Sequence, residues 1–261
     1  MPVIIFTSKQ TASKNAANCL IELGFEKIKN DEWQYKKIRL IDTNVDSVLD
    51  VPTNFDTDYL IVLSSHKSKN NEPALTAHFP GNWNEALFGG EAKTLNIAYA
   101  SKLKIIMQNI KNLAEKESFK LNWDVTLEVD HHGPTCNLPI IYVEIGCTEK
   151  EWNNKHAGKI IAEAVLKATE SEKIYETVFG IGCGHYPKEF NKLEFEDEIA
   201  MGHILPKYHL STLDNNLFSQ AIEKNVEKVS KVYVLKEKIN VKEKKNIKEL
   251  CDSFSVEYIE L

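Results

Sequence analysis

Two hydrophobic patterns alternate along the chain. Short runs of apolar residues are separated by segments whose apolar residues recur every three or four positions. The first pattern is typical of buried strands, and the second of helices with one buried face. The strands predicted in this way span residues 3–6, 34–41, 59–63, 74–77, 125–130, 140–144, 173–179, 232–235 and 256–261. The predicted helices span residues 11–23, 92–115, 148–169, 215–228 and 241–254.

This alternation of strands and helices predicts an α/β fold, with a mixed, largely parallel sheet flanked by helices. Residues 1–261 contain no internal repeat, low-complexity segment or proline-rich linker, so we expect a single domain. A chain of 261 residues, 43% of them hydrophobic, can bury a large core. In such folds, ligands bind beyond the carboxyl ends of the strands.

Composition and charge limit where in the cell the protein is expected and which partners it can bind. No apolar run approaches the ~18 residues of a membrane span, and the amino-terminal segment lacks the basic start of a secretory signal. The five cysteines show neither C-x-x-C nor zinc-finger spacing, which favours reduced thiols in the cytoplasm. We expect a monomer with no obligate protein partner. The net charge of -6 gives no general attraction for nucleic acid, so an RNA partner would need a local basic patch.

Groups capable of chemistry gather in residues 124–152. Apolar and polar residues alternate in 125–130, as in a strand with one buried face, and the strand runs directly into His131 and His132. The Gly-Pro step that follows ends this strand, because proline has no amide hydrogen. A second apolar run then ends at Glu144. If the two runs pair, the two histidines and Glu144 share one edge of the sheet.

Six of the eight histidines lie in short segments punctuated by glycine, proline or serine. A single histidine in a turn is often merely solvated, but several such segments at strand ends indicate one site assembled from distant parts of the chain. His156 falls within a predicted helix and is left out of the site. The six are His66, His78, His131, His132, His185 and His203.

The glycines at alternate positions in G-I-G-C-G-H-Y-P (180–187) allow a backbone to approach a ligand closely. A dinucleotide-binding fingerprint is excluded by spacing, because His185 stands where the third glycine would be needed. A phosphate-binding loop stays open as an alternative.

Six blocks in this order carry a family resemblance. They are S-S-H-K-S (64–68), L-T-A-H-F-P-G-N-W (75–83), L-E-V-D-H-H-G-P-T (127–135), V-E-I-G-C-T-E-K-E-W (143–152), G-I-G-C-G-H-Y-P (180–187) and G-H-I-L-P-K-Y (202–208). Together they resemble the archaeal and plant type of D-aminoacyl-tRNA deacylase. The resemblance implies hydrolysis of the ester that joins a D-amino acid to the 3′ end of tRNA. It also implies a fold similar to bacterial peptidyl-tRNA hydrolase with added elements, and zinc as a cofactor. Cys147 and Cys183 depart from the smaller residues expected there.

An aminoacyl ester is already activated, so water, a base and a group that stabilises the oxyanion suffice for its hydrolysis. We expect His132 to be the general base or a metal ligand, with Glu144 orienting it or sharing the metal, and His131 and His185 to be the next candidates. The oxyanion would be held by the hydroxyl of Thr135 or by backbone amides around Gly182 and Gly184. A catalytic zinc ion needs three protein ligands and an open position, for which His132, His185 and Glu144 are the candidates.

The substrate would be held by a wider set of residues. His78, Asn82 and Trp83 would receive the terminal adenosine, and Lys67, Lys69 and Lys207 would meet phosphate. The full set of expected substrate-binding residues is His66, Lys67, His78, Asn82, Trp83, Gly182, Gly184, His185, Tyr186 and His203.

Two alternative functions stay open. A peptidyl-tRNA or related amide hydrolase on the same scaffold would turn over N-blocked aminoacyl-tRNA. A phosphorylase-like, nucleoside-binding protein would instead bind free nucleosides through the glycine segment, and tRNA would not change its thermal stability.

Overall fold

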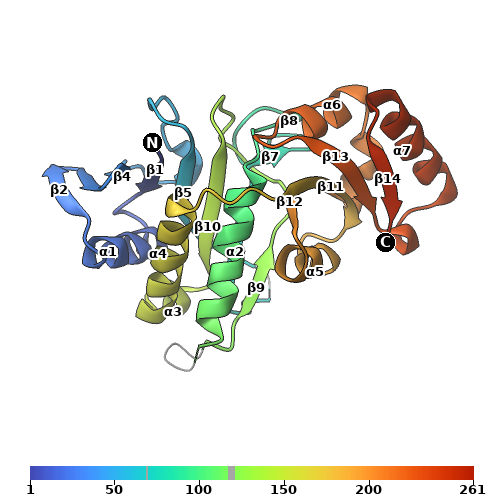
Figure 1. Cartoon of the computed structure of the whole chain (residues 1–261). Helices are drawn as coiled ribbons and strands as arrows, with labels where there is room; N and C mark the ends of the chain where they lie inside the picture. Colours follow the sequence, from blue (N-terminus) through green and yellow to red (C-terminus); the bar gives the residue numbers. More distant parts are fainter. Residues whose placement is uncertain (69, 117–120) are drawn as a thin grey trace.

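Two large β-sheets, a short two-stranded sheet, and helices between and beside them form the protein (Figure 1). It is seen here as a computed structural model that describes residues 1–68, 70–116 and 121–261. The strands are β1 Val3–Phe6, β2 Glu26–Lys29, β3 Glu32–Tyr35, β4 Ile38–Asp42, β5 Leu60–His66, β6 Ala74–His78, β7 Gly81–Asn82, β8 Thr94–Leu95, β9 Asp124–Leu127, β10 Ile140–Gly146, β11 Glu176–Cys183, β12 Ile199–Pro206, β13 Val229–Val234 and β14 Glu257–Glu260. The α-helices are α1 Thr11–Glu22, α2 Ala100–Ala114, α3 Glu149–Trp152, α4 Lys155–Glu170, α5 Lys188–Glu196, α6 Asn215–Glu223 and α7 Val241–Phe254. Short 3-10 helices are η1 Val48–Asp50, η2 Lys207–Thr212 and η3 Lys236–Lys238.

The larger sheet has the strand order β2-β3-β4-β1-β5-β10-β6-β9, and the smaller one has the order β12-β11-β13-β14. The larger sheet is mixed: β1 pairs in parallel with β4 and β5, β5 with β10, and β6 with β9, whereas β6 and β10 are antiparallel. All pairs of the smaller sheet are parallel. The predicted α/β fold with a mixed, largely parallel sheet is confirmed, and a second parallel sheet is added to it.

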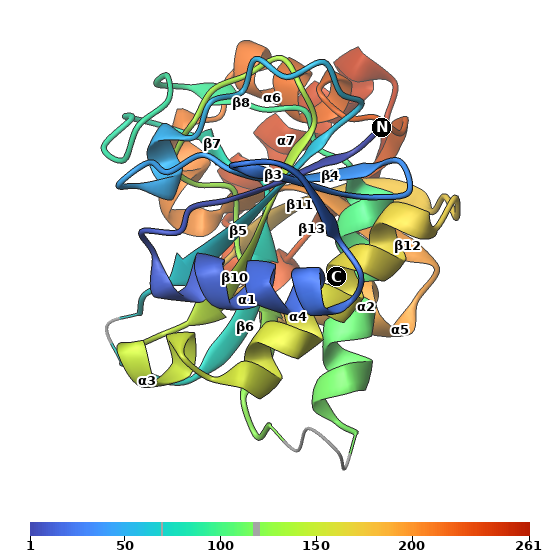
Figure 2. The same ribbon diagram turned by 90° about the vertical axis from the view of Figure 1, so that its left-hand side faces the viewer.

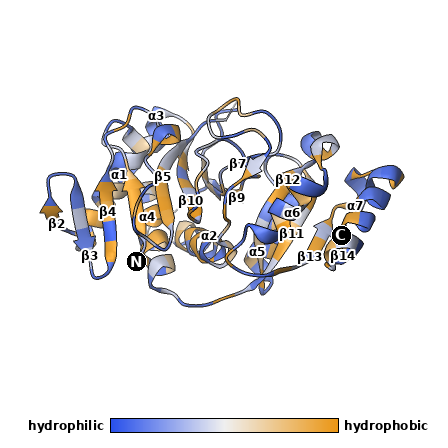
Figure 3. Ribbon diagram, turned by 90° about the horizontal axis from the view of Figure 1, so that it is seen from above, coloured by the Kyte–Doolittle hydropathy of each residue, from blue (hydrophilic) through white to orange (hydrophobic). Residues whose placement is uncertain are grey.

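Helices α1, α2 and α4 cover one face of the larger sheet (Figure 2). Its other face is covered by the segment around η1, where Val48 and Val51 pack on central strands. Because both faces are covered, the central strand β5 is apolar and buried over Leu60–Leu63, as expected for a parallel strand inside a sheet. Hydrophobic residues accordingly gather on the strands, and hydrophilic residues on the surrounding loops (Figure 3).

Helix α2 lies between the two sheets and contacts both β6 and β12. One hydrophobic core includes residues of both sheets, from Ile4 to Leu235. This continuity supports our proposal that residues 1–261 form a single domain. Within the described part of the chain, no helix has the length and apolar character needed to cross a membrane.

Several predicted elements differ from those observed. The strand expected at 34–41 is instead β3 and β4, joined by a tight turn in which Lys36 has a φ of 52°. The helix expected from residue 92 begins at Ala100, because residues 94–95 pair as β8. The helix expected over 148–169 is divided into α3 and α4, since Asn154 accepts hydrogen bonds from two backbone amides and starts a new helix.

Two further differences concern the site. The strand before His131 does not pair with the strand that carries Glu144, because β6 lies between β9 and β10. Helix α5 and strand β12 were not predicted. The glycine and histidine of M-G-H-I-L-P suggested a loop, but these residues form a strand that is buried from Ala200 to Pro206.

Candidate active site

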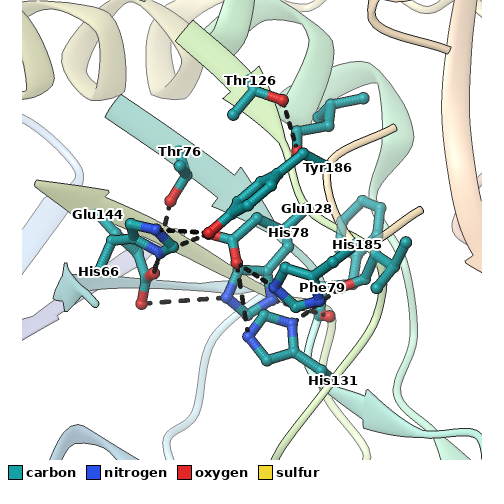
Figure 4. A network of polar contacts seen from close by, with 12 residues as sticks. His66, Thr76, His78, Phe79, Thr126, Glu128, His131, Glu144, His185 and Tyr186 are labelled. Atoms are coloured by element: carbon teal, nitrogen blue, oxygen red, sulfur yellow. Dashed lines mark hydrogen bonds and ion pairs between the residues drawn. The ribbon is translucent and has the colours of Figure 1, made fainter. Parts of the chain in front are cut away.

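Histidine and glutamate side chains from both sheets meet at one place in the structure (Figure 4). We call this set the His/Glu cluster; it consists of His66, His78, Glu128, His131, His132, Glu144 and His185. Strand register explains part of it. On β10, Glu144 lies opposite Ser64 of β5 and Thr76 of β6, so it stands near the ends of both strands, where His66 and His78 are found.

Glu128 lies at the centre of the cluster, with its side chain 1% exposed. Its Oε2 is 2.9 Å from Nε2 of His185 and 3.7 Å from Nε2 of His131, and its Oε1 is 3.0 Å from Nδ1 of His66. The amide of Val129 donates to the carbonyl of His185, so the loop after β9 is joined directly to the loop after β11. The site therefore combines Glu128, which follows a strand of the larger sheet, with His185, which follows a strand of the smaller sheet.

Glu144 is the second buried carboxylate of the cluster. Its Oε2 lies 3.6 Å from Nδ1 of His66 and accepts a hydrogen bond from the Thr76 hydroxyl at 3.4 Å, while its Oε1 lies 4.0 Å from Nε2 of His78. The Tyr186 hydroxyl lies 3.0 Å from Nε2 of His66. His66 is therefore held between two carboxylates and a phenol.

Three histidines share one orientation of the imidazole ring. Nδ1 of His78 lies 3.1 Å from the carbonyl oxygen of Phe79, Nδ1 of His131 lies 2.8 Å from that of Val129, and Nδ1 of His132 contacts that of Gly133. A carbonyl oxygen only accepts, so in each ring Nδ1 carries a hydrogen, and whenever the ring is neutral Nε2 presents its lone pair.

His131 and His132 both face the cluster although they are consecutive residues. Side chains of successive residues in a strand point to opposite sides. His132 breaks this rule, because its φ of 51° is left-handed. Its ring centroid lies 4.6 Å from that of His131 and 4.8 Å from that of His78.

Burial and neighbouring charges shift the pKa values of these groups in opposite directions. Burial lowers the pKa of His66, but the carboxylates of Glu128 and Glu144 outweigh it and raise the pKa to about 10. Burial and the nearby His78 lower the pKa of His131 to about 4 and that of His132 to about 3. Burial opposes ionisation of Glu128 and Glu144, yet the surrounding histidines hold both pKa values below the usual range.

The cluster contains donors that suit a metal ion. Ligand atoms lie within 4.8 Å of one another in three groups: His78 with His131 and His132, Glu128 with His131 and His185, and His66 with Glu128 and Glu144. Two buried atoms of the cluster lack a well-aligned hydrogen bond: Nε2 of His78, and Oε1 of Glu128, which has only the ion-pair contact with His66. The trio expected from sequence, His132, His185 and Glu144, is divided among the three groups.

The three residues expected to bind the terminal adenosine are buried and contact other parts of the protein. Trp83 is 1% exposed, stacks on Phe179 and donates from Nε1 to the carbonyl of Ile204. Asn82 is buried and donates to the carbonyls of Gly89 and Glu91, so it shapes a loop. His78 belongs to the cluster and is 1% exposed.

His203 lies outside the cluster. It is fully buried in β12, with Nδ1 at 2.7 Å from Oδ1 of Asp130 and Nε2 at 2.9 Å from the carbonyl of Lys224. The loop predicted around His203 is therefore wrong, and both of its ring nitrogens have partners within the protein. The same Asp130 accepts a hydrogen bond from the amide of Ile204, which fixes the segment after β9 to β12.

The glycine segment is also more buried than predicted. Gly180 and Gly182 belong to β11, where an added Cβ would meet Met201 at 2.7 Å in the first case and Ile239 at 2.8 Å in the second. These glycines allow close packing of the core. Gly184 is exposed and has open space beside it.

The remaining candidates lie around the cluster. Thr135 accepts a hydrogen bond from the amide of Glu91 at 2.9 Å. Lys67 lies over the ring of Trp152, with Nζ 5.4 Å from the centroid. Lys207 is exposed at the start of η2. Lys69, also expected to meet phosphate, lies outside the described residues.

Sequence reasoning missed Glu128 and Tyr208. Glu128 was taken as part of the polar face of a strand, but both faces of that segment are buried. The signal was present, because a glutamate at the end of an otherwise buried strand, three residues before a histidine, needs a partner. Tyr208 lies with its hydroxyl 3.2 Å from Nδ1 of His185, a contact that no local pattern indicates.

Comparison with known proteins agrees with this geometry. The profile of the family described as D-aminoacyl-tRNA deacylase matches residues 53–259. The chain is similar to D-aminoacyl-tRNA deacylases from Pyrococcus furiosus (30% identity, covering 99% of each chain) and Thermococcus kodakarensis (34%, covering 90% of each). It also resembles the enzyme from Saccharolobus islandicus, with 36% identity over 76% of this chain and 81% of the relative.

The fold has a close counterpart among solved structures. The crystal structure of AF0625, a conserved protein of unknown function, matches it with a TM-score of 0.88 and 23% identity, covering 100% of this chain and 95% of the other. The match of the fold extends over the whole chain, and the range matched by the family profile spans the positions of the His/Glu cluster. The chain therefore belongs to the D-aminoacyl-tRNA deacylase family, hydrolases that act on tRNA.

Proposed function

We propose that the His/Glu cluster is where this protein hydrolyses the ester bond of D-aminoacyl-tRNA, releasing the D-amino acid and tRNA. One observation carries the proposal: Nε2 of His131 lies 3.7 Å from the buried carboxylate of Glu128, within a cluster whose nitrogen and carboxylate oxygen atoms form groups less than 4.8 Å across. A water molecule beside these atoms finds acceptors for its protons, which is what a hydrolytic nucleophile requires.

His131 is the favoured general base. Its side chain is 30% exposed, so substrate can reach it, and its Nε2 lies 3.7 Å from the carboxylate of Glu128. The water oxygen bonds to the carbonyl carbon of the ester, its proton passes to His131, and Glu128 stabilises the resulting imidazolium. The bond to the 3′ oxygen of the ribose then breaks, and that oxygen takes up a proton. Burial and His78 lower the pKa of both His131 and His132, and His131 is favoured because its Nε2 lies beside the carboxylate of Glu128.

Thr135 is a candidate for stabilising the oxyanion. Its Oγ1 accepts from the amide of Glu91, which leaves the hydroxyl hydrogen free to donate. This role follows the expectation from sequence, and the position of Thr135 two residues beyond Gly133 supports it.

The donor set also fits the zinc ion implied by the family resemblance. Imidazole nitrogen and carboxylate oxygen are zinc ligands, and a histidine that ligates zinc commonly donates its other nitrogen to a carbonyl, as His78, His131 and His132 do. These three histidines, whose ligand atoms lie within 4.8 Å of one another, would hold the ion, and Glu128 would then accept the proton of water in place of His131. When bound, it would lower the pKa of water and polarise the ester carbonyl.

The charge of the cluster also supports the binding of a metal cation there. Two carboxylates are buried together, so positive charge must accompany them. In the protein alone, this charge comes from His66 and His78, whose pKa values the carboxylates raise despite burial. A divalent cation would satisfy the same two carboxylates without protonated imidazoles.

Turnover of D-tyrosyl-tRNA and L-tyrosyl-tRNA by the purified protein tests the function. We expect rapid deacylation of the D-substrate and little of the L-substrate. Equal rates would indicate a general esterase, and turnover of N-acetyl-tyrosyl-tRNA would indicate a peptidyl-tRNA hydrolase. Full activity after chelation, with metal absence verified by mass spectrometry, would remove zinc from the mechanism.

We further propose that the protein acts in the cytoplasm as a monomer, on a scaffold related to peptidyl-tRNA hydrolase. All five cysteines are free, which supports a reducing compartment. Light scattering during size-exclusion chromatography tests the monomer: a mass near 29.7 kDa is expected, and twice that mass would contradict it.

A further inference from the structure

The loop between β7 and β8 carries two exposed apolar side chains beside the His/Glu cluster. Leu87 is 76% exposed and Phe88 is 66% exposed. The carbonyl of Phe88 accepts a hydrogen bond from the amide of Gly133 at 3.0 Å, and Gly133 directly follows His132. The loop that displays Phe88 is therefore attached to the segment that supplies two histidines of the site.

The backbone of this loop is held firmly. Asn82 donates to the carbonyls of Gly89 and Glu91, and the amide of Glu91 donates to Thr135. Gly90 and Gly133 approach so closely that a Cβ on Gly133 would lie 2.3 Å from the amide nitrogen of Gly90. A loop fixed by so many contacts, yet with an aromatic ring at its exposed tip, presents that ring in a defined place.

A second exposed aromatic ring adjoins the cluster from the smaller sheet. Tyr208, in η2, is 56% exposed, and its hydroxyl lies 3.2 Å from Nδ1 of His185. Because Nε2 of His185 contacts Glu128, the Tyr208 hydroxyl donates to Nδ1. Phe88 and Tyr208 thus reach the cluster through different elements, one beside His132 and the other through His185.

We propose that Phe88 and Tyr208 are stacking surfaces for the unpaired nucleotides at the 3′ end of the substrate tRNA. The inference rests on the proposed function, since an ester that reaches the cluster brings these nucleotides with it. Unpaired bases are commonly held by stacking on exposed aromatic side chains. Trp83 and His78 cannot offer a free face from their buried positions.

Charge favours stacking over phosphate contacts at this loop. The chain carries a net charge of -6, and Glu85 and Glu91 lie on either side of Leu87 and Phe88. Carboxylates repel the phosphate backbone but leave the faces of the bases unaffected. Lys207, exposed and next to Tyr208, is the cation best placed to meet a phosphate on the other side.

The test uses the full-length protein and a tRNA acceptor stem-loop whose 3′-terminal adenosine is replaced by 2-aminopurine, a base whose fluorescence is quenched by stacking. We expect the wild-type protein to quench it. Phe88→Ala and Tyr208→Ala should each reduce the quenching and raise the KM for D-tyrosyl-tRNA at least about fivefold, with a smaller effect on kcat. Phe88→Trp and Tyr208→Phe should retain the quenching, because each keeps an aromatic face.

Val241→Ala is the matched control, since Val241 is 85% exposed at the start of α7 and should leave both readouts unchanged. Unchanged quenching and KM in both alanine variants would overturn the inference, as would a dimer of the wild-type protein that Phe88→Ala dissociates. The proposed function fails separately: in that case the wild-type protein itself does not deacylate D-tyrosyl-tRNA. Equal loss of kcat in the alanine and conservative variants would show a structural role and would also overturn the inference.

Discussion

Glu128 accepts a hydrogen bond from Nε2 of His185 at 2.9 Å, although the two residues are fifty-seven positions apart and belong to segments that follow different sheets. The contact unites the two halves of the fold at the site. It also fixes the tautomer of His185, because the Tyr208 hydroxyl occupies the other ring nitrogen. Glu128 therefore links the loop of β9 to the loop of β11 both structurally and electrostatically.

Glu128→Gln should reduce the rate of D-tyrosyl-tRNA deacylation by about 10²–10⁴-fold, the contribution usual for acid-base groups. The neutral amide can still form a hydrogen bond with His185 but cannot stabilise a positive charge on His131 or His66. Single-turnover rates measure the effect. Glu26→Gln, at an exposed position of β2, is the matched control and should behave as wild type. Activity within threefold of wild type (about 0.7 kcal/mol) would remove Glu128 from the mechanism.

Zinc should stabilise the protein through the cluster. A ligand that binds only the folded state adds about 2.7 kcal/mol to the free energy of unfolding when its free concentration is about 100 times its Kd. We expect zinc to raise the Tm of the chelated wild-type protein, and His131→Ala and His132→Ala to lose most of this increase. His156→Ala, which changes an exposed histidine of α4, should keep it. A Tm increase that survives in both cluster variants would place the metal elsewhere.

We expect Trp83 to stabilise the folded protein and not to contact the substrate. Its ring is buried against Phe179, and its Nε1 donates to the carbonyl of Ile204. Trp83→Ala should therefore lower the free energy of unfolding by about 3–5 kcal/mol. Trp83→Phe keeps an aromatic ring but loses the hydrogen bond, so a smaller loss is expected, with the KM for D-tyrosyl-tRNA near the wild-type value. Urea denaturation and steady-state kinetics on the same preparations separate the two roles. A raised KM with an unchanged free energy of unfolding would instead show that Trp83 binds the substrate.

Hydrophobic patterns predicted those helices and strands whose burial can be recognised from residues close in sequence. The apolar run of β5 and the period of α2 needed no knowledge of distant segments. The strand β12 could not be recognised in this way. Its Gly202 and His203 are typical of a loop, and His203 is accepted in a buried strand only because Asp130 and the carbonyl of Lys224 satisfy both of its nitrogens.

The same distinction applies to the site. Their positions at strand ends identified His66, His131 and His185 as members of one constellation, although His66 is the last residue of β5 and not part of a loop. The structure brings the three together around Glu128. Glu128 itself was hidden, because alternation in a strand cannot show whether the second face is solvated or covered. The roles predicted for individual residues, including the expected trio of metal ligands, stay predictions.

Glu194 should make stability depend on pH at a place remote from the cluster. It is fully buried in α5, where its Oε2 accepts from the amide of Met201 while Oε1 makes no hydrogen bond. Burial raises the pKa of its carboxyl from 4.5 to about 7, although Lys104 opposes this shift. The ammonium of Lys104 is itself held by backbone carbonyls, among them that of Ile199 at 2.6 Å, so it keeps its partners if Glu194 is replaced.

Because the folded protein holds this proton more tightly than the unfolded chain, the stabilisation is complete below pH 4.5 and is lost as the pH rises through about 7. The shift corresponds to at most about 3 kcal/mol. Glu194→Gln mimics the protonated form, so its free energy of unfolding relative to wild type should increase between pH 5 and pH 8, as measured by urea denaturation at each pH. Glu196→Gln, on the exposed side of the same helix, should show no such change. A difference between Glu194→Gln and wild type that is constant with pH would mean that Glu194 titrates normally in the folded protein, and that water or Lys104 compensates its burial.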